Sequence, residues 1–337
     1  LITNSGPGTI EVEVDASYSA IANAIGINVG TLGGSIANSG NIDATADATT
    51  SAIANAIGIN VGMLESGGSI TNSGYVEATV YASSSAEANA FGINVVTLGG
   101  SIANSGRIDA SADGSDSASV SALGINISTL ASGGSITNSG TIDVFAEGSS
   151  SSAEANAFGI KVATLASGGS ITNSGTIEAE ASVYASSSTS FSAEANAYGI
   201  NLSTLASGGS ITNSGTIEAE ARAYDSSSSS YSATGTAYGI YVGDAAGNIE
   251  NSGNISATAG GFAHGIVVEG TLTGTIENNG TGSGDGIHVG HDFSSSSSSS
   301  PPTRYAEGIF VETIGDGGSI SNSGNIYVEA DDSSSAF

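Results

Sequence analysis

The chain has 337 residues and is rich in small side chains, with 50 Gly, only 3 Pro, and neither Cys nor Trp. Four Lys and Arg against 32 Asp and Glu give a net charge of −28, which repels nucleic acid phosphates and anionic membrane surfaces. The lack of Cys excludes disulfides, Cys-containing zinc sites and thiol catalysis. No run of about 18 apolar residues is available to span a bilayer, so we expect no membrane insertion of this segment.

The first element of the chain belongs to a cassette whose clearest copies occupy residues 168–179 and 208–219. Its core is Asn-Ser-Gly or Asn-Asn-Gly followed closely by Ile or Val, and a Gly-Ile pair follows each copy. The cassette Asn recurs at positions 4, 38, 72, 104, 138, 173, 213, 251, 278 and 322, and the Gly of the pair recurs at 26, 58, 92, 124, 159, 199, 239, 265, 286 and 308. Two landmarks in constant order define one coil of a repeat array.

Three short strands are predicted in each coil. The first is Ser-Ile-x-Asn, as at residues 35–38, and Ser-Gly then makes a tight corner. The second alternates with period two, which places Ile177 and Ala179 inward and Glu178 and Glu180 outward. The third is the Ala-x-Ala-Asn-Ala-x-Gly-Ile-x-Val segment. Stacking of such coils predicts an all-β fold, a parallel β-helix (β-solenoid) of about ten coils, roughly 48 Å long at 4.8 Å per coil.

In the third strand we place the large residues Phe91, Ile93 and Val95 inside. The alternative is the opposite parity, with Ala inside and the aromatic residues exposed. The chosen parity puts one set of Asn side chains inward or at a corner, where amides stack from coil to coil. That set is Asn23, Asn55, Asn89, Asn156 and Asn196. It also leaves outer Ala positions for lateral packing of rods: Ala88, Ala90, Ala155 and Ala157.

We expect one continuous solenoid over residues 1–337. Long coils with Ser-rich corner loops occupy residues 1–260, and shorter, less regular coils occupy residues 261–337. The loops lie between the second and third strands, at residues 83–85, 149–152, 186–190 and 226–230. A Ser- and Pro-rich stretch at residues 292–305 is predicted to be a flexible flap.

The G-S-I-x-N-S-G-x-I and A-x-G-I-x-V cassettes resemble the passenger repeats of bacterial autotransporter and related haemagglutinin-like surface proteins, over essentially the whole chain. The resemblance implies a right-handed parallel β-helix, exported from a Gram-negative cell and displayed or released outside it as a stalk or adhesin. It carries no catalytic residues to transfer. The long Ser-rich loops depart from the family pattern, and no C-terminal membrane barrel is present in this sequence.

One acidic residue follows the first Ile or Val of the second strand in seven successive coils. These residues are Glu11, Asp43, Glu77, Asp109, Asp143, Glu178 and Glu218. Stacking turns them into an outward column of carboxylates about 4.8 Å apart, a hard-oxygen surface that suits Ca²⁺, the one candidate cofactor. The alternative is a solvated acidic face that keeps rods soluble and apart.

The sequence offers two further candidate sites, a histidine group that could hold a transition metal and a polysaccharide-cleaving centre. His264, His288 and His291 lie close together in sequence near Asp285 and Asp292, but without a full ligand set they are interpreted as surface residues. Several β-helix enzymes cleave polysaccharides, and their sites need convergent acidic or basic residues. Here the basic residues are scattered over different coils, at Arg107, Lys161, Arg222 and Arg304.

We therefore expect a non-enzymatic, extracellular structural or adhesive β-solenoid, a rigid stalk or fibre at a bacterial cell surface. The alternative is a filament subunit that stacks head to tail, and a polysaccharide-active enzyme is less favoured. The expected partners are the protein itself, by end-to-end or lateral association, or a host or cell-surface receptor or glycan, and not nucleic acid.

Overall fold

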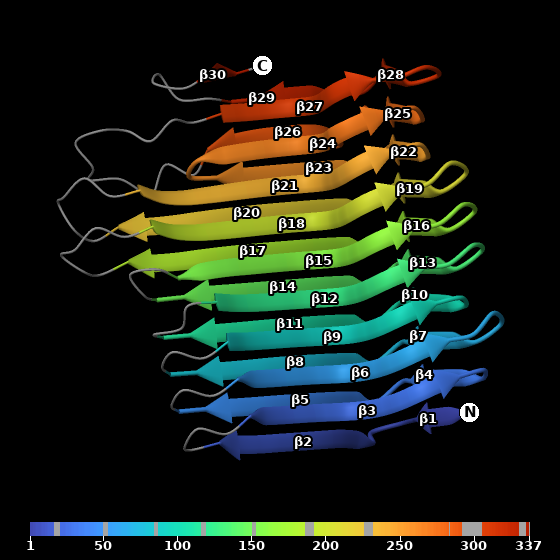
Figure 1. Ribbon diagram of the computed structural model, residues 1–337, viewed down its shortest axis with the longest axis vertical. Coiled ribbons are helices and arrows are strands. Elements are labelled where there is room, and N and C mark those ends of the chain that lie inside the picture. Colours follow the sequence, from blue (N-terminus) through green and yellow to red (C-terminus); the bar gives the residue numbers. More distant parts are fainter. Residues whose placement is uncertain are drawn as a thin grey trace.

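The computed structural model describes residues 1–16, 21–49, 53–83, 87–115, 119–149, 153–185, 192–225, 232–282, 284–291, 305–329 and 335–336. Its strands form three ten-stranded parallel sheets, and each coil contributes one strand to each sheet (Figure 1). The chain therefore adopts the predicted all-β parallel β-helix. Of the Ser-rich loops only Ser83 and Ser149 fall within the described residues, and the predicted flap lies outside them except for Tyr305.

Sheet A is built from the Ser-Ile-x-Asn strands and forms the narrow edge of the solenoid. Its strands are β1 (Ile2–Asn4), β4 (Ser35–Asn38), β7 (Ser69–Asn72), β10 (Ser101–Asn104), β13 (Ser135–Asn138), β16 (Ser170–Asn173), β19 (Ser210–Asn213), β22 (Asn248–Asn251), β25 (Thr275–Asn278) and β28 (Ser319–Asn322).

Sheet B is built from the alternating second strands. They are β2 (Thr9–Ala16), β5 (Asn41–Ala48), β8 (Tyr75–Ala82), β11 (Arg107–Gly114), β14 (Thr141–Gly148), β17 (Thr176–Ala185), β20 (Thr216–Asp225), β23 (Asn254–Ala259), β26 (Gly286–His291) and β29 (Ile326–Val328).

Sheet C is built from the Ala-rich third strands, which are the longest. They are β3 (Ala22–Leu32), β6 (Ala54–Leu64), β9 (Glu87–Leu98), β12 (Ser119–Leu130), β15 (Glu154–Leu165), β18 (Ser192–Leu205), β21 (Ser232–Ala245), β24 (Phe262–Leu272), β27 (Tyr305–Ile314) and β30 (Ser335–Ala336).

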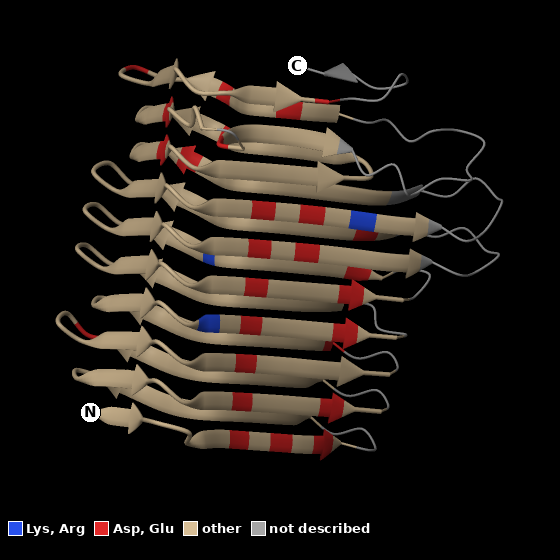
Figure 2. Cartoon of the chain, turned by 180° about the vertical axis from the view of Figure 1, so that it is seen from behind, with Lys and Arg blue, Asp and Glu red and all other residues tan. Residues whose placement is uncertain are grey.

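The coil is right-handed. The strands of sheet C run left to right across the near side in Figure 1, and those of sheet B return across the opposite side, which faces the reader in Figure 2, while the chain rises from the N-terminus to the C-terminus. This is the handedness expected for connections between parallel strands.

The core lies between the three sheets and is made of Ile, Val, Leu and Ala. In sheet B the predicted alternation is confirmed, because Ile177 and Ala179 are buried while Glu178 and Glu180 face outward. Each inward Ile stacks on its equivalent in the next coil, as Ile142 does on Ile177. Burying one such side chain stabilises the fold by about 1.5–3 kcal/mol.

The predicted parity of the third strand is wrong in its first half. Ala88 and Ala90 are fully buried and Phe91 faces outward, whereas Ile93 and Val95 point into the core as expected. Ala155 and Ala157 are likewise buried, so none of these four Ala residues offers an outer surface for lateral packing.

The phase changes at the Gly of the Gly-Ile pair, where two consecutive residues face inward. Gly286 is the exception, because it begins β26 of sheet B and not a third strand, which corrects the prediction. A Cβ added to Gly159 would overlap Cγ2 of Ile177 in sheet B and the carbonyl oxygen of Gly199 in the next coil. Only Gly fits between the two sheets at this point, and the side chain before it is thereby turned to the outside.

This change of phase also determines where the Asn residues of the third strand lie. Asn23, Asn55, Asn89, Asn156 and Asn196 lie on the outer face of sheet C and not in the interior or at a corner, which corrects the prediction. They still stack from coil to coil, as the side-chain amide of Asn55 donates to that of Asn23 at 2.8 Å.

The buried amides are those of the Asn-Ser-Gly cassette, at the junction of sheets A and B. Each cassette Asn from Asn4 to Asn278 donates its side-chain N–H to the side-chain oxygen of the Asn in the following coil, at 2.7–2.8 Å. The second N–H of Asn138 reaches the carbonyl oxygen of Thr176 at 3.1 Å. This inner Asn ladder is thus a continuous hydrogen-bonded column inside the protein.

Candidate functional site

The seven acidic residues predicted to form a column do so, on the outer face of sheet B. Glu11, Asp43, Glu77, Asp109, Asp143, Glu178 and Glu218 occupy the same position in β2, β5, β8, β11, β14, β17 and β20, and each is in register with the next. Figure 2 shows the acidic residues as bands across this face. The position is taken by Ser256 in β23, where the column ends.

Arg107 supplies counter-charge in the middle of the acidic column. Its Nε lies 2.6 Å from Oδ1 of Asp109, and its Nη2 lies 2.7 Å from Oδ2 of Asp143 in the next coil. The hydroxyl of Tyr75 donates to Oδ2 of Asp109 at 2.6 Å. Arg107 therefore pairs with two of the seven carboxylates and makes them less available to an ion from outside.

Burial and the crowding of negative charge raise pKa values along the acidic column. Burial, followed by the charge of Asp43, raises the pKa of Glu77. Burial, followed by the charge of Glu218, raises the pKa of Glu178. The pKa of Asp143 is raised in the same way, although Arg107 opposes the shift. Protons or cations bound to this face therefore relieve repulsion between coils.

A tighter group of acids lies on sheet B at its N-terminal end. One carboxylate oxygen from each of Glu13, Asp15 and Asp47 lies within 4.8 Å of the others. Burial, and then the charge of Asp15, raises the pKa of Asp47. The sequence interpretation followed only the first acidic position after each Ile and missed this group. Its signal was the run of alternate acids Glu11, Glu13 and Asp15, with Asp47 aligned on the last of them.

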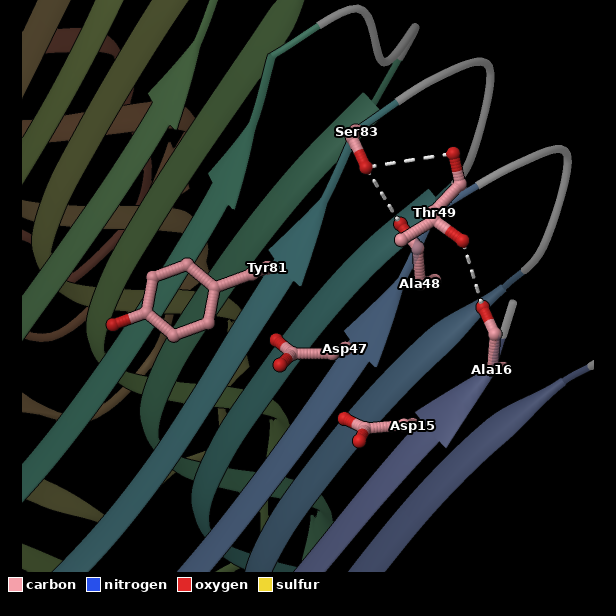
Figure 3. Close-up of a pocket in the computed structure, with 7 residues that line it drawn as sticks. All are labelled: Asp15, Ala16, Asp47, Ala48, Thr49, Tyr81 and Ser83. Atoms are coloured by element: carbon pink, nitrogen blue, oxygen red, sulfur yellow. Dashed lines mark hydrogen bonds between the residues drawn. The ribbon is translucent and has the colours of Figure 1, made fainter.

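Two of these acids, Asp15 and Asp47, line a pocket of about 460 Å³ at the end of the strands (Figure 3). Asp15, Asp47 and Tyr81 project from neighbouring strands on the same side. The Ser83 hydroxyl donates to the carbonyl oxygen of Ala48 at 3.3 Å and ties the strand ends together. Carboxylate oxygens clustered in this way suit a hard cation such as Ca²⁺, with water completing its six to eight ligands. The Ca²⁺ assignment for the acidic column stays a prediction.

The histidines whose side chains are described do not gather into one site. His264 is half-buried, stacks on Tyr238 and lies 3.0 Å from Glu307 through Nδ1, so it is not the freely exposed residue we expected. His288 lies on sheet B, where its ring is tilted against that of Tyr327. The side chain of His291 is outside the described part of the chain.

The described basic residues are likewise separate from one another. Arg222 pairs with Glu180 and Glu220 on sheet B, whereas Lys161 lies on sheet C with its Nζ 4.2 Å from the centre of the Phe158 ring. Arg304 is outside the described residues. Among the residues that are described, Arg107 and Arg222 share the outer face of sheet B but lie three coils apart, so the basic side chains do not converge on one site.

No family model matches the chain, and neither the curated proteins nor the solved structures contain a significantly similar chain. Within the described residues, we find no helical segment with the length and hydropathy needed to cross a lipid bilayer.

Proposed function

We propose that the protein is a non-enzymatic structural or adhesive β-solenoid, which acts as a rigid stalk or fibre outside a bacterial cell. The observation that carries this proposal is the strict register of the coils, in which each strand pairs residue for residue with its equivalent in the next coil. In a solenoid of this kind, each additional coil lengthens a stiff rod.

The distribution of acidic and amide side chains on the surface supports the same role. Acidic side chains occur in columns along sheet B and amide side chains in columns along sheet C, as expected for a scaffold that repeats one unit. An acid and base pair for hydrolysis needs two carboxyl groups in different environments that converge on one bond. Regular columns favour a long, uniform contact surface over such a pair.

The extracellular location rests on the resemblance to autotransporter passenger repeats and on the composition. A chain with no Cys does not depend on the redox state of its compartment, and a net charge of −28 keeps extended rods apart in solution. The partners that fit the surface are a cell-surface receptor, a glycan or a second copy of this chain.

Electron microscopy of the purified protein, combined with binding to bacterial and host cell surfaces, tests the proposal. We expect stiff rods that bind a surface or glycan saturably and release no reducing sugar from uronate polymers. Flexible or globular particles would rule out a stalk, and catalytic turnover on a uronate polymer would replace this function with that of a polysaccharide-cleaving enzyme.

A filament subunit is the second candidate. The parallel pairing that joins coil to coil in all three sheets is one that a coil of a second copy can continue. Sedimentation at rising protein concentration separates the two roles, because end-to-end stacking produces a growing series of oligomers.

A further inference from the structure

A groove of about 300 Å³ lies on the outer face of sheet C near its C-terminal end. It crosses β21, β24 and β27. Register aligns Tyr238, His264 and Glu307 in one column along it. Tyr241, Val267 and Phe310 form a second column three residues further along the strands. The groove therefore joins side chains from three successive coils that are far apart in sequence.

The groove is lined mainly by aromatic rings. Tyr238 and His264 stack with centroids 4.9 Å apart, and Phe262 and Tyr305 stack at 5.5 Å. Tyr241 packs edge-on against Tyr238 at 5.2 Å. These contacts hold the rings in place before any ligand arrives, so binding orders few side chains.

Two carboxylates accompany the rings, and no Lys or Arg is among the described residues that line the groove. Glu269 accepts a hydrogen bond from the hydroxyl of Tyr241, and Glu307 faces Nδ1 of His264 at 3.0 Å. Burial lowers the pKa of His264, and Glu307 only partly opposes that shift. A lowered pKa favours the neutral form of His264, which does not cancel the negative charge of Glu307.

In an earlier coil, a lysine ammonium group of the protein already lies against the column of aromatic side chains that leads to Tyr238. Phe158 is aligned with Tyr198 and, one coil later, with Tyr238. Lys161 is aligned in the same way with Asn201 and Tyr241, and its Nζ lies 4.2 Å from the centre of the Phe158 ring.

At the groove the lysine position is occupied by Tyr241, Val267 and Phe310 in turn. The chain thus supplies its own ammonium group to the column at Lys161. At the groove it supplies rings and carboxylates, and the described lining residues include no matching cation.

We propose that this groove binds an organic cation, an alkylammonium or guanidinium group presented by a ligand. The rings supply cation–π attraction and apolar contact for the alkyl part, and Glu307 and Glu269 supply the counter-charge. The strongly negative field of the whole protein raises the local concentration of such a ligand. This site does not depend on the proposed structural or adhesive role, because binding is measured on the isolated protein.

Isothermal titration calorimetry with choline at low ionic strength tests the proposal. Its neutral isostere, 3,3-dimethylbutan-1-ol, has the same shape without the charge. We expect saturable binding of choline with one site per chain, and binding of the isostere that is at least tenfold weaker. A parallel titration with butylguanidinium tells whether the groove prefers a planar guanidinium to a quaternary ammonium.

Two variants locate the site. We expect Glu307→Gln to weaken choline binding about tenfold, which corresponds to one charge-assisted contact of about 1.4 kcal/mol. The matched control is Glu178→Gln, which removes the same charge from sheet B and is expected to leave binding within twofold of the unchanged protein. Phe310→Leu, at a position 38% exposed, should also weaken binding while the circular dichroism spectrum stays the same.

Three results would overturn the proposal. One is a titration with no saturable phase. Another is equal loss of binding in Glu307→Gln and Glu178→Gln, which would show diffuse attraction to a polyanion. The third is equal affinity for choline and its neutral isostere, which would show an apolar pocket without cation recognition.

Discussion

The side-chain amide of Asn138 donates to the side-chain oxygen of Asn173 at 2.8 Å, and both side chains are completely buried. The same bond links coil to coil along the inner Asn ladder, so each amide is both donor and acceptor within the interior. A buried polar column of this kind is stable only when every member is satisfied. The ladder therefore fixes the register of the coils as well as adding hydrogen bonds.

Replacing Asn138 by Leu is expected to destabilise the protein by about 2–4 kcal/mol, since each buried polar group left without a partner costs roughly 1–3 kcal/mol. The substitution removes the acceptor for Asn104 and the donor to Asn173. Guanidinium denaturation measures the change. The matched control is Asn94→Leu on the outer face of sheet C, where Asn94 is hydrogen-bonded to Asn60 and Asn126 at 2.8 Å. Water replaces the lost bonds there, and we expect a cost under about 1 kcal/mol. Equal costs at the two positions would contradict a special role for the inner ladder.

Gly159→Ala is expected to cost about 2–3 kcal/mol, because the added Cβ overlaps Ile177 and the backbone of Gly199 in a packed interior. Gly30→Ala provides the control. An added Cβ there meets nothing within 4 Å, and we expect a change within about 0.5 kcal/mol. Thermal melting of both variants gives the comparison, and an unperturbed Gly159→Ala protein would mean that the sheets can separate at the point where the strand changes phase.

Acidification from pH 7 is expected to stabilise the acidic column. The pKa of Glu77 is raised in the folded protein above its ordinary value of 4.5, so folding favours its protonated form. Its stabilising contribution is therefore fully present below the unfolded pKa and is lost as pH rises through the higher folded pKa.

Glu77→Gln mimics the protonated form and tests this pH dependence. We expect it to raise the melting temperature at pH 7 and to have little effect at pH 4. Glu65→Gln, at an exposed position outside the acidic column, controls for net charge. An identical pH profile for Glu77→Gln and Glu65→Gln would assign the effect to overall charge instead of the column.

Calcium is expected to raise the melting temperature saturably, because a divalent cation relieves repulsion among Glu13, Asp15 and Asp47 and along the acidic column. Melting curves with calcium, with a chelator and with sodium at equal ionic strength measure the effect. Asp47→Asn should remove the part that arises at the three-acid group, while Glu178→Gln should affect only the column. If the chelator leaves the midpoint unchanged at low ionic strength, the calcium hypothesis is wrong for both.

Much of the fold could be predicted from local sequence patterns. The period-two alternation at Ile177 to Glu180 requires a strand with one buried face, and the repeated Asn-Ser-Gly and Gly-Ile landmarks set the number and order of coils. Parallel stacking of identical strands then places equivalent acids in a column without further information. These features follow from residues that are close in sequence or identical between repeats.

Which side chains of the third strand face the core could be determined only from the tertiary structure. Alternation alone does not say which parity faces the core when both sides carry apolar residues, and Gly159 admits two consecutive inward positions only because Ile177 of sheet B packs against it. The groove on sheet C has the same origin, since Tyr241, His264 and Phe310 become neighbours only through the stacking of three coils. Side chains on different coils meet at distances set by register and sheet packing, which no local pattern in the sequence encodes.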